Sequence, residues 1–289
     1  MTERTKSGVQ DLNAEHRPRG AYGFQLTGVP AARELLVEAP SHWPRLDLEV
    51  CITSEPEPPG DHVDDEFAVL RLRSGGSARI ERGAGCATFM LGQRPSDGAL
   101  VHPHLASVAV VAAHWLGRET FHAGAFLAGG GVWGVLGDKE AGKSSLLASL
   151  ALAGVPVVSD DILVLDQMMA LAGPRSIDLR AGAARHLAVG EAVGVMGTRE
   201  RWRLVLGPIA AEAPMRGWVL LRWDTDTGVR ALSGSERLIR LAAHRGGRLY
   251  PPEPGLLVAL SALPVLELRR PQSWESGRDA IERLLEAVG

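Results

Sequence analysis

Eight residues near the middle of the chain constrain its fold more than any other feature. They run from Gly137 to Ser144, read GDKEAGKS, and match the pattern G-x-x-x-x-G-K-[ST] at every fixed position. An apolar run, Val132 to Leu136, precedes the pattern, and a helical run, Ser144 to Ala153, follows it. This order of strand, loop and helix is typical of loops that bind the phosphates of a nucleotide. The sequence therefore predicts an α/β domain with a phosphate-binding loop.

The residue types of this loop suit a chain of phosphates. Glycine allows the backbone N–H groups to turn inward, and the N-terminus of the following helix adds a favourable dipole. Lys143 would place its ammonium beside the β- and γ-phosphates, and the Ser144 hydroxyl would coordinate Mg²⁺. The predicted nucleotide-binding residues are Gly137, Asp138, Lys139, Glu140, Ala141, Gly142, Lys143, Ser144 and Ser145. Because ATPases, GTPases and kinases share this loop, it predicts the ligand and not the reaction.

Two adjacent carboxylates follow the next predicted strand. The apolar run Val155 to Val158 leads through one serine into Asp160 and Asp161. At the end of a strand beside a phosphate loop, one carboxylate can bind Mg²⁺ while the other accepts a proton from an attacking hydroxyl. The alternative is a solvated acidic turn before the next apolar run. The nearby phosphate loop favours the first interpretation.

One histidine precedes the loop at a distance that a hairpin could close. His122 lies fifteen positions before Gly137, and Gly129 to Gly131 separate two apolar runs between them. A glycine-rich turn between such runs is typical of a hairpin, which would return the chain and bring His122 near the loop. A single histidine is more often structural than catalytic, so the spacing alone does not assign it a role.

Four segments together resemble the catalytic domain of HPr kinase/phosphorylase and its kinase-like relatives. In chain order they are Phe121 to Gly124, Gly134 to Gly137, Gly142 to Ser145, and Ser159 to Asp161. The resemblance covers about residues 101–166 and includes the seventeen positions from Lys143 to Asp160. It implies an α/β P-loop kinase domain of HPr kinase type that uses ATP and Mg²⁺.

The same resemblance implies roles for individual residues. The catalytic residues would be His122, Lys143 and Asp160, with Asp160 as the base, and the Mg²⁺ ligands would be Ser144 and Asp161. A histidine in this setting can hydrogen-bond the carboxylate and tune its proton affinity. The bifunctional relatives carry a second, glycine-rich signature after the carboxylates, and this sequence has no counterpart to it. We therefore expect phosphoryl transfer to the acceptor without the reverse step.

Two other segments precede the predicted kinase domain. Residues 1–20 are polar and charged without an apolar stretch, and they predict a disordered leader. Residues 21–100 contain short β-like runs separated by glycine turns, which predict a small, mostly β module. Residues 101–289 would form the P-loop kinase-like domain, which opens with a helix from Pro103 to Leu116.

Composition narrows the range of partners. The net charge is -3 and the pI is about 6.3, so no global basic field would attract nucleic acid. The apolar stretches are shorter than the roughly 20 residues of a membrane span. The two cysteines, Cys51 and Cys86, fit reduced thiols rather than a disulfide framework. We expect a cytoplasmic protein without nucleic acid or membrane partners, and the sequence leaves a homo-oligomer open.

Arginines cluster in the C-terminal half. They include Arg201 and Arg203, whose planar guanidinium groups would suit the transferring phosphoryl group or an acidic acceptor. The alternative is a set of surface arginines in solvent, which is common in an arginine-rich chain. His102 and His104 flank Pro103 at the predicted helix start, and we interpret both as structural rather than as metal ligands.

These features leave three functions open. The first is an ATP- and Mg²⁺-dependent kinase acting on a Ser or Thr hydroxyl of a peptide or protein, because kinases of the resembling family include enzymes that modify biosynthetic precursor peptides. The second is a small-molecule hydroxyl kinase, such as a free-serine kinase. The third is a nucleotide-binding regulator without phosphoryl transfer. His122 and Asp160 favour chemistry over a switch.

Overall fold

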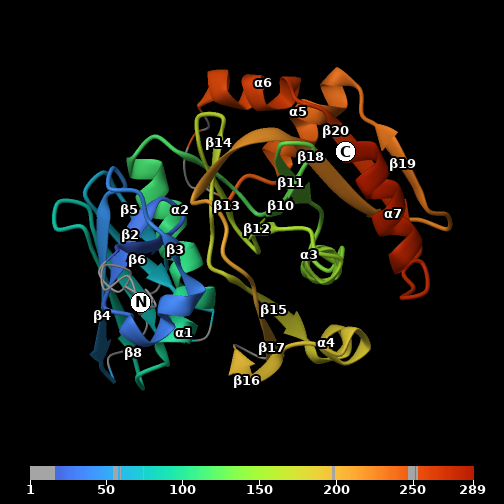
Figure 1. Ribbon diagram of the computed structural model, residues 1–289. Coiled ribbons are helices and arrows are strands. Elements are labelled where there is room, and N and C mark those ends of the chain that lie inside the picture. Colours follow the sequence, from blue (N-terminus) through green and yellow to red (C-terminus); the bar gives the residue numbers. More distant parts are fainter. Residues whose placement is uncertain are drawn as a thin grey trace, which may run out of the picture.

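Three β-sheets form the frame of the chain in a computed structural model (Figure 1). The structure describes residues 17–289 apart from 55–57, 59, 74, 197–198, 247–250 and 252. Within these residues the sheets have eight, nine and three strands. In Figure 1 the first sheet lies at the left, and the C-terminal helices lie at the top and right. The chain is a mixed α/β protein.

The first sheet collects the strands of the N-terminal third. Its order is β3-β1-β2-β4-β8-β7-β6-β5. The bounds are β1 Arg19–Ala21, β2 Phe24–Thr27, β3 Val37–Glu38, β4 Arg45–Ile52, β5 His62–Val63, β6 Phe67–Arg71, β7 Ser77–Glu81 and β8 Cys86–Leu91. β4 pairs in parallel with β2 and β8, and the remaining pairs are antiparallel. Burial alternates along β6 and β8, as expected for strands with one face on a core.

The structure agrees only in part with the predicted boundaries of the N-terminal segments. Residues 1–16 of the predicted leader lie outside the described residues, whereas Arg19 and Gly20 belong to β1 and not to a leader. The division into domains stays a prediction. Phe89 of the first sheet and Phe121 of the second belong to one continuous apolar core, so this core extends across both sheets.

A buried helix joins the first sheet to the second. The connecting elements are α1 Asp97–Ala99, a π-helical turn Leu100–His104 and α2 Leu105–Trp115. The helix starts two residues after the predicted Pro103, because His102 is extended and Pro103 lies in the irregular turn. Gly117, with φ 71°, follows its end, where a glycine suits the left-handed conformation. α2 is apolar on nearly all sides and contacts β6, β7 and β9, which explains its burial.

The second sheet carries the predicted nucleotide-binding elements. Its order is β12-β10-β11-β18-β14-β13-β9, with β20 beside β18 and β19 beside β20. The bounds are β9 Glu119–Phe121, β10 Gly124–Ala128, β11 Gly131–Leu136, β12 Val157–Ser159, β13 Leu163–Asp166, β14 Met169–Leu171, β18 Glu212–Trp223, β19 Gly228–Ala231 and β20 Val265–Arg270. β10 and β11 form the predicted hairpin, with Gly129 and Gly130 at φ 56° and 80°. β11, β18 and β20 run parallel, so their C-terminal ends share one edge.

Four helices accompany this sheet. They are α3 Lys143–Leu152, α5 Gly234–Ala243, α6 Pro254–Ala262 and α7 Gly277–Val288. α3 packs on β10 and α7, α7 packs on β19 and β20, and α5 packs on α6. None of the helices in the described part of the chain is long and apolar enough to span a membrane.

The third sheet is small and is tied to the start of α2. Its order is β15-β17-β16, and the bounds are β15 Ser176–Arg180, β16 Glu191–Met196 and β17 Arg199–Val205, with α4 Ala181–Leu187 after β15. Arg203 of β17 forms a buried ion pair with Asp178 of β15, through two hydrogen bonds of 2.8 Å. Arg203 also donates to the carbonyl oxygens of Gly98 and His102 at 2.9 and 2.6 Å. One guanidinium therefore links β15, β17 and the segment that opens α2.

Candidate active site

The predicted phosphate loop lies between β11 and α3. α3 begins at Lys143, one residue before the predicted start. Gly142 precedes it with φ 83°, and a Cβ there would lie 2.5 Å from Nη2 of Arg270, so both conformation and packing require glycine. Among the described residues no side chain caps this helix N-terminus. Its first N–H groups can therefore face an anionic ligand.

Lys143 folds back over its own loop. Its Nζ donates to the carbonyl oxygens of Gly137 and Asp138 at 2.7 and 3.3 Å. Burial lowers the pKa of Lys143, and the carboxylates of Asp161, Asp160 and Asp138 act in the opposite direction. The ammonium is thus held at the loop, where a phosphate could replace the carbonyl oxygens as its partner.

Ser144 and Asp160 form a hydrogen-bonded pair beside the loop. The Ser144 Oγ donates to Oδ1 of Asp160 at 2.9 Å and so joins the first turn of α3 to the end of β12. Asp160 is only 3% exposed, and burial raises its pKa to about 6, while His102 acts against that rise. Mg²⁺ is usually bound through one or two protein oxygen ligands together with substrate phosphates. The residue types and position of this pair fit such a site.

His122 and Asp161 form a second, more exposed pair. Nδ1 of His122 lies 3.4 Å from Oδ1 of Asp161, and the two side chains are 46% and 43% exposed. Asp161 has φ 71°, in the left-handed region, at a turn in which the N–H of Ile162 donates to the Asp160 carbonyl. Burial lowers the pKa of His122, although Asp161 opposes this effect. The β10–β11 hairpin thus leaves His122 beside the carboxylate pair.

Two residues that the sequence analysis missed hold the loop from its other side. Arg270, the last residue of β20, donates from Nη2 to the carbonyl oxygens of Ala141 and Gly142 at 3.1 and 3.3 Å. Its guanidinium lies 4.5 Å from the ring centroid of Trp223, the last residue of β18, which itself donates to the Glu140 carbonyl at 3.3 Å. Burial lowers the pKa of Arg270 to about 10, which leaves it charged at neutral pH. The loop is therefore braced by the ends of both neighbouring parallel strands.

The arginines that contact the loop differ from those that the sequence suggested. Arg203 is committed to its buried ion pair, which corrects its predicted contact with a phosphate or acceptor. Arg201 makes no ion pair with the loop in the described part of the chain. Arg180 and Arg199 instead lie 3.0 and 3.4 Å from Oε1 of Glu140. Two guanidinium groups against one exposed carboxylate leave net positive charge at this side of the loop.

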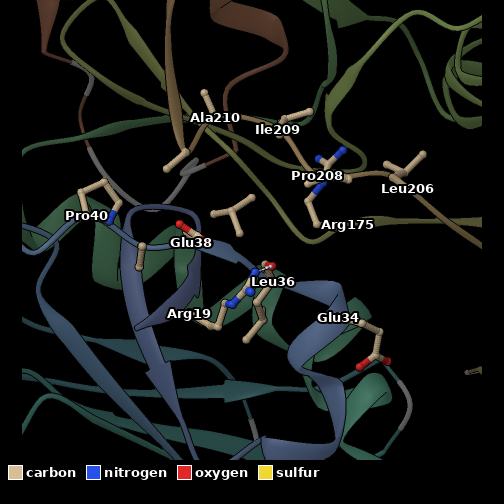
Figure 2. A pocket seen from close by; sticks show the side chains of 13 residues that line it. Arg19, Glu34, Leu36, Glu38, Pro40, Arg175, Leu206, Pro208, Ile209 and Ala210 are labelled. Carbon is tan, nitrogen blue, oxygen red and sulfur yellow. Dashed lines mark hydrogen bonds between the residues drawn. The ribbon is translucent and has the colours of Figure 1, made fainter. Parts of the chain in front are cut away.

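A cavity of about 610 Å³ lies apart from the phosphate loop, between the first sheet and the segment before β18 (Figure 2). Residues between 34 and 40 line one side, and residues between 206 and 211 line the other. Arg175 also lines it, but its Nε and Nη2 donate to the Gly207 carbonyl at 3.0 and 2.9 Å. The lining contains neither the loop nor the carboxylate pair, so this cavity is separate from the candidate active site.

Comparison with known proteins adds a distant resemblance. No protein-family model matches the chain, and no curated protein matches its sequence. Among solved structures, the HPr(Ser) kinase/phosphatase from Coxiella burnetii is similar over 58% of this chain and 95% of its own chain, with 11% sequence identity and a TM-score of 0.30. A similarity this weak does not assign a function.

Proposed function

We propose that this protein is an ATP- and Mg²⁺-dependent kinase that phosphorylates a Ser or Thr hydroxyl of a peptide or protein. One observation carries the proposal: the lysine and serine of a single phosphate-loop motif lie beside the buried Asp160 and near a half-exposed histidine–aspartate pair. Together these groups offer a cation for phosphates, a metal site and a proton acceptor. Phosphoryl transfer depends mainly on positioned charges and one base, which is what this set provides.

The buried pair is the better metal site. Ser144 and Asp160 would hold Mg²⁺, which when bound would neutralise charge on the nucleotide phosphates. Asp160 is nearly inaccessible and already accepts a hydrogen bond from Ser144, so an acceptor hydroxyl could hardly approach it. This geometry favours an exchange of the two roles that the family resemblance implied. Asp160 then binds the metal, and Asp161 is left for the proton.

The exposed pair is the better proton acceptor. The Asp161 side chain is 43% exposed, so an acceptor hydroxyl can approach its carboxylate. In the transfer, the acceptor oxygen bonds to the γ-phosphorus, the bond from that phosphorus to the bridging oxygen breaks, and Asp161 takes the hydroxyl proton. ADP and the phosphorylated acceptor are the products. His122, with its lowered pKa, is mainly neutral at pH 7 and can orient the Asp161 carboxylate through Nδ1.

Mass spectrometry tests the proposal directly. The purified chain is incubated with ATP, Mg²⁺ and either a library of Ser- and Thr-containing peptides or free serine. A phosphorylated peptide supports the proposal, and phosphoserine from free serine would instead identify a small-molecule kinase. ATP binding without any phosphorylated product would contradict both and favour a regulator. Incubation of the phosphorylated product with excess inorganic phosphate then tests the expected lack of a reverse step.

ATP with Mg²⁺ should raise the melting temperature, and Lys143→Ala should remove most of the rise. A ligand that binds only the folded chain stabilises it by about 2.7 kcal/mol at one hundred times its Kd. The substitution deletes the ammonium that now lies on the Gly137 and Asp138 carbonyls. Thermal unfolding with and without millimolar nucleotide measures the effect. Arg185→Ala is the control, because the Arg185 side chain donates to the Ala181 carbonyl within α4. An unchanged wild-type melting temperature would contradict nucleotide binding.

Arg270→Lys should weaken ATP binding about tenfold, although it keeps the charge. Lysine cannot stack on Trp223 and also donate to two loop carbonyls, and one charge-assisted hydrogen bond is worth about 1.5 kcal/mol. Titration calorimetry measures the change. Arg269→Lys is the matched control, because the neighbouring Arg269 faces Asp224 at 3.6 Å and is 41% exposed. Equal affinities for the two variants would show that Arg270 does not support the loop.

A further inference from the structure

Tyr22 of the first sheet occupies an unusual position for a tyrosine. It lies in the two-residue turn between β1 and β2, with φ 57°, and Gly23 follows with φ 83°. Two-residue turns in which both residues have positive φ favour Asn, Asp or Gly at the first position, so local conformational preference does not explain a tyrosine there. The residue is also fully buried. A reason for its presence should therefore lie in its tertiary contacts.

Those contacts lead to the carboxylate pair. The Tyr22 N–H donates to the Ala172 carbonyl at 2.7 Å, and the N–H of the next residue, Gly173, donates to the Val158 carbonyl at 3.0 Å. A Cβ on Gly173 would lie 2.9 Å from Cε1 of the Tyr22 ring and 2.2 Å from Oγ of Ser159. The hydroxyl-bearing end of the ring and the Ser159 side chain therefore meet at this glycine.

Ser159 itself closes the turn that presents both carboxylates. Its Oγ donates to the Ile162 carbonyl in a short hydrogen bond that spans Asp160 and Asp161. Since its proton is used in that bond, Ser159 offers only oxygen lone pairs toward Tyr22. The Tyr22 side chain therefore reaches the carboxylate turn from the first sheet, next to Ser159.

The Tyr22 side chain carries a hydroxyl group that packing in the core does not require. This hydroxyl is buried and meets no partner at full hydrogen-bond geometry within the described residues, yet the Ser159 side chain lies close enough to act on it as a hydrogen-bond partner and to lower its pKa. Burial raises its pKa well above the usual value, and Asp161 and Asp160 raise it further, so the phenol stays protonated. Phenylalanine would fill the same space without a buried donor. A retained donor beside two carboxylates is best explained by an interaction with their turn.

We infer that Tyr22 is a positioning residue, whose hydroxyl supports the Ser159–Asp161 turn and holds both carboxylates in register with the phosphate loop. The kinetic part of this inference rests on the proposed kinase function. It makes the first sheet a working part of the active site and not a separate module. It also accounts for the hydrogen bond from the β1–β2 turn to Ala172, the residue after β14 of the second sheet.

Tyr22→Phe tests the inference because it removes the hydroxyl and keeps the ring. We expect the melting temperature to stay the same or rise, the Kd for Mn²⁺ in the presence of ATP to increase about tenfold, and kcat to fall about tenfold with little change in KM. Electron paramagnetic resonance measures free Mn²⁺, used in place of Mg²⁺. Ser176→Ala is the matched control, since Ser176 carries a buried hydroxyl without a partner in the described residues. Ser176→Ala should change neither the Kd for Mn²⁺ nor kcat.

Three outcomes would overturn the positioning role. If the Mn²⁺ affinity and the kcat of Tyr22→Phe both stay within twofold of wild type, the hydroxyl does not support the turn. Equal losses in Tyr22→Phe and Ser176→Ala, or a large drop in the melting temperature of Tyr22→Phe, would show general packing instead. If the wild-type protein transfers no phosphate, only the kinase proposal is contradicted. The Mn²⁺ affinities of wild type and Tyr22→Phe would still decide the role of Tyr22.

Discussion

Asp161→Asn should lower the rate of phosphoryl transfer by about 10²- to 10⁴-fold while leaving nucleotide binding intact. Asparagine has nearly the same shape as aspartate, but its amide cannot accept the proton of the attacking hydroxyl. The change is made at a half-exposed side chain that lies beside His122, so the fold should not suffer. Single-turnover transfer rates and calorimetric ATP binding separate the two effects.

Asp160→Asn should instead act on the binding of the nucleotide with Mg²⁺. It removes a charge from the buried pair with Ser144, so binding of the nucleotide should lose its dependence on Mg²⁺. Asp166→Asn serves as the control for both variants, because Asp166 is a half-exposed carboxylate paired with Arg118 at 3.0 Å. If Asp160→Asn keeps Mg²⁺-dependent binding and loses only transfer, Asp160 is the base, as the family resemblance implied. Equal transfer by Asp161→Asn and wild type would remove Asp161 from the mechanism.

Arg203→Ala should destabilise the fold by about 3–5 kcal/mol, which is a large part of the stability of a typical domain. The substitution leaves the Asp178 carboxylate buried without its cation, and it removes the donors to the Gly98 and His102 carbonyls. Urea denaturation measures the loss. Arg201→Ala, two positions away on the same strand, should stay within about 0.5 kcal/mol of wild type.

The double variant Asp178→Asn with Arg203→Met separates a buried charge from general packing. It removes the uncompensated carboxylate together with its partner, so it should recover part of the stability lost in Arg203→Ala. A loss below about 1 kcal/mol in Arg203→Ala would contradict the buried ion pair and would reopen Arg203 as an active-site residue.

Local features of the sequence predicted the local parts of the site. The hairpin of β10 and β11, the loop after it and the start of α3 within one residue all follow from nearby glycines and from the hydrophobic periodicity. These elements need only short-range information, because a glycine turn and an amphipathic or buried run fix their own conformation. The mixed pairing within the first sheet has no such local signal, since parallel partners are distant in the chain.

The sequence by itself determined the candidate chemistry: a phosphate-loop motif, its lysine and serine, two carboxylates and a histidine at usable spacings. Only the tertiary structure decided how these groups differ. It buried Asp160 against Ser144, left Asp161 half-exposed beside His122, placed Arg203 in a buried ion pair, and brought Trp223 and Arg270 to the loop from the ends of two other strands. The reason is physical. Exposure, proton affinity and hydrogen-bond partners depend on which elements pack around a side chain, and strand pairing between remote segments sets that packing.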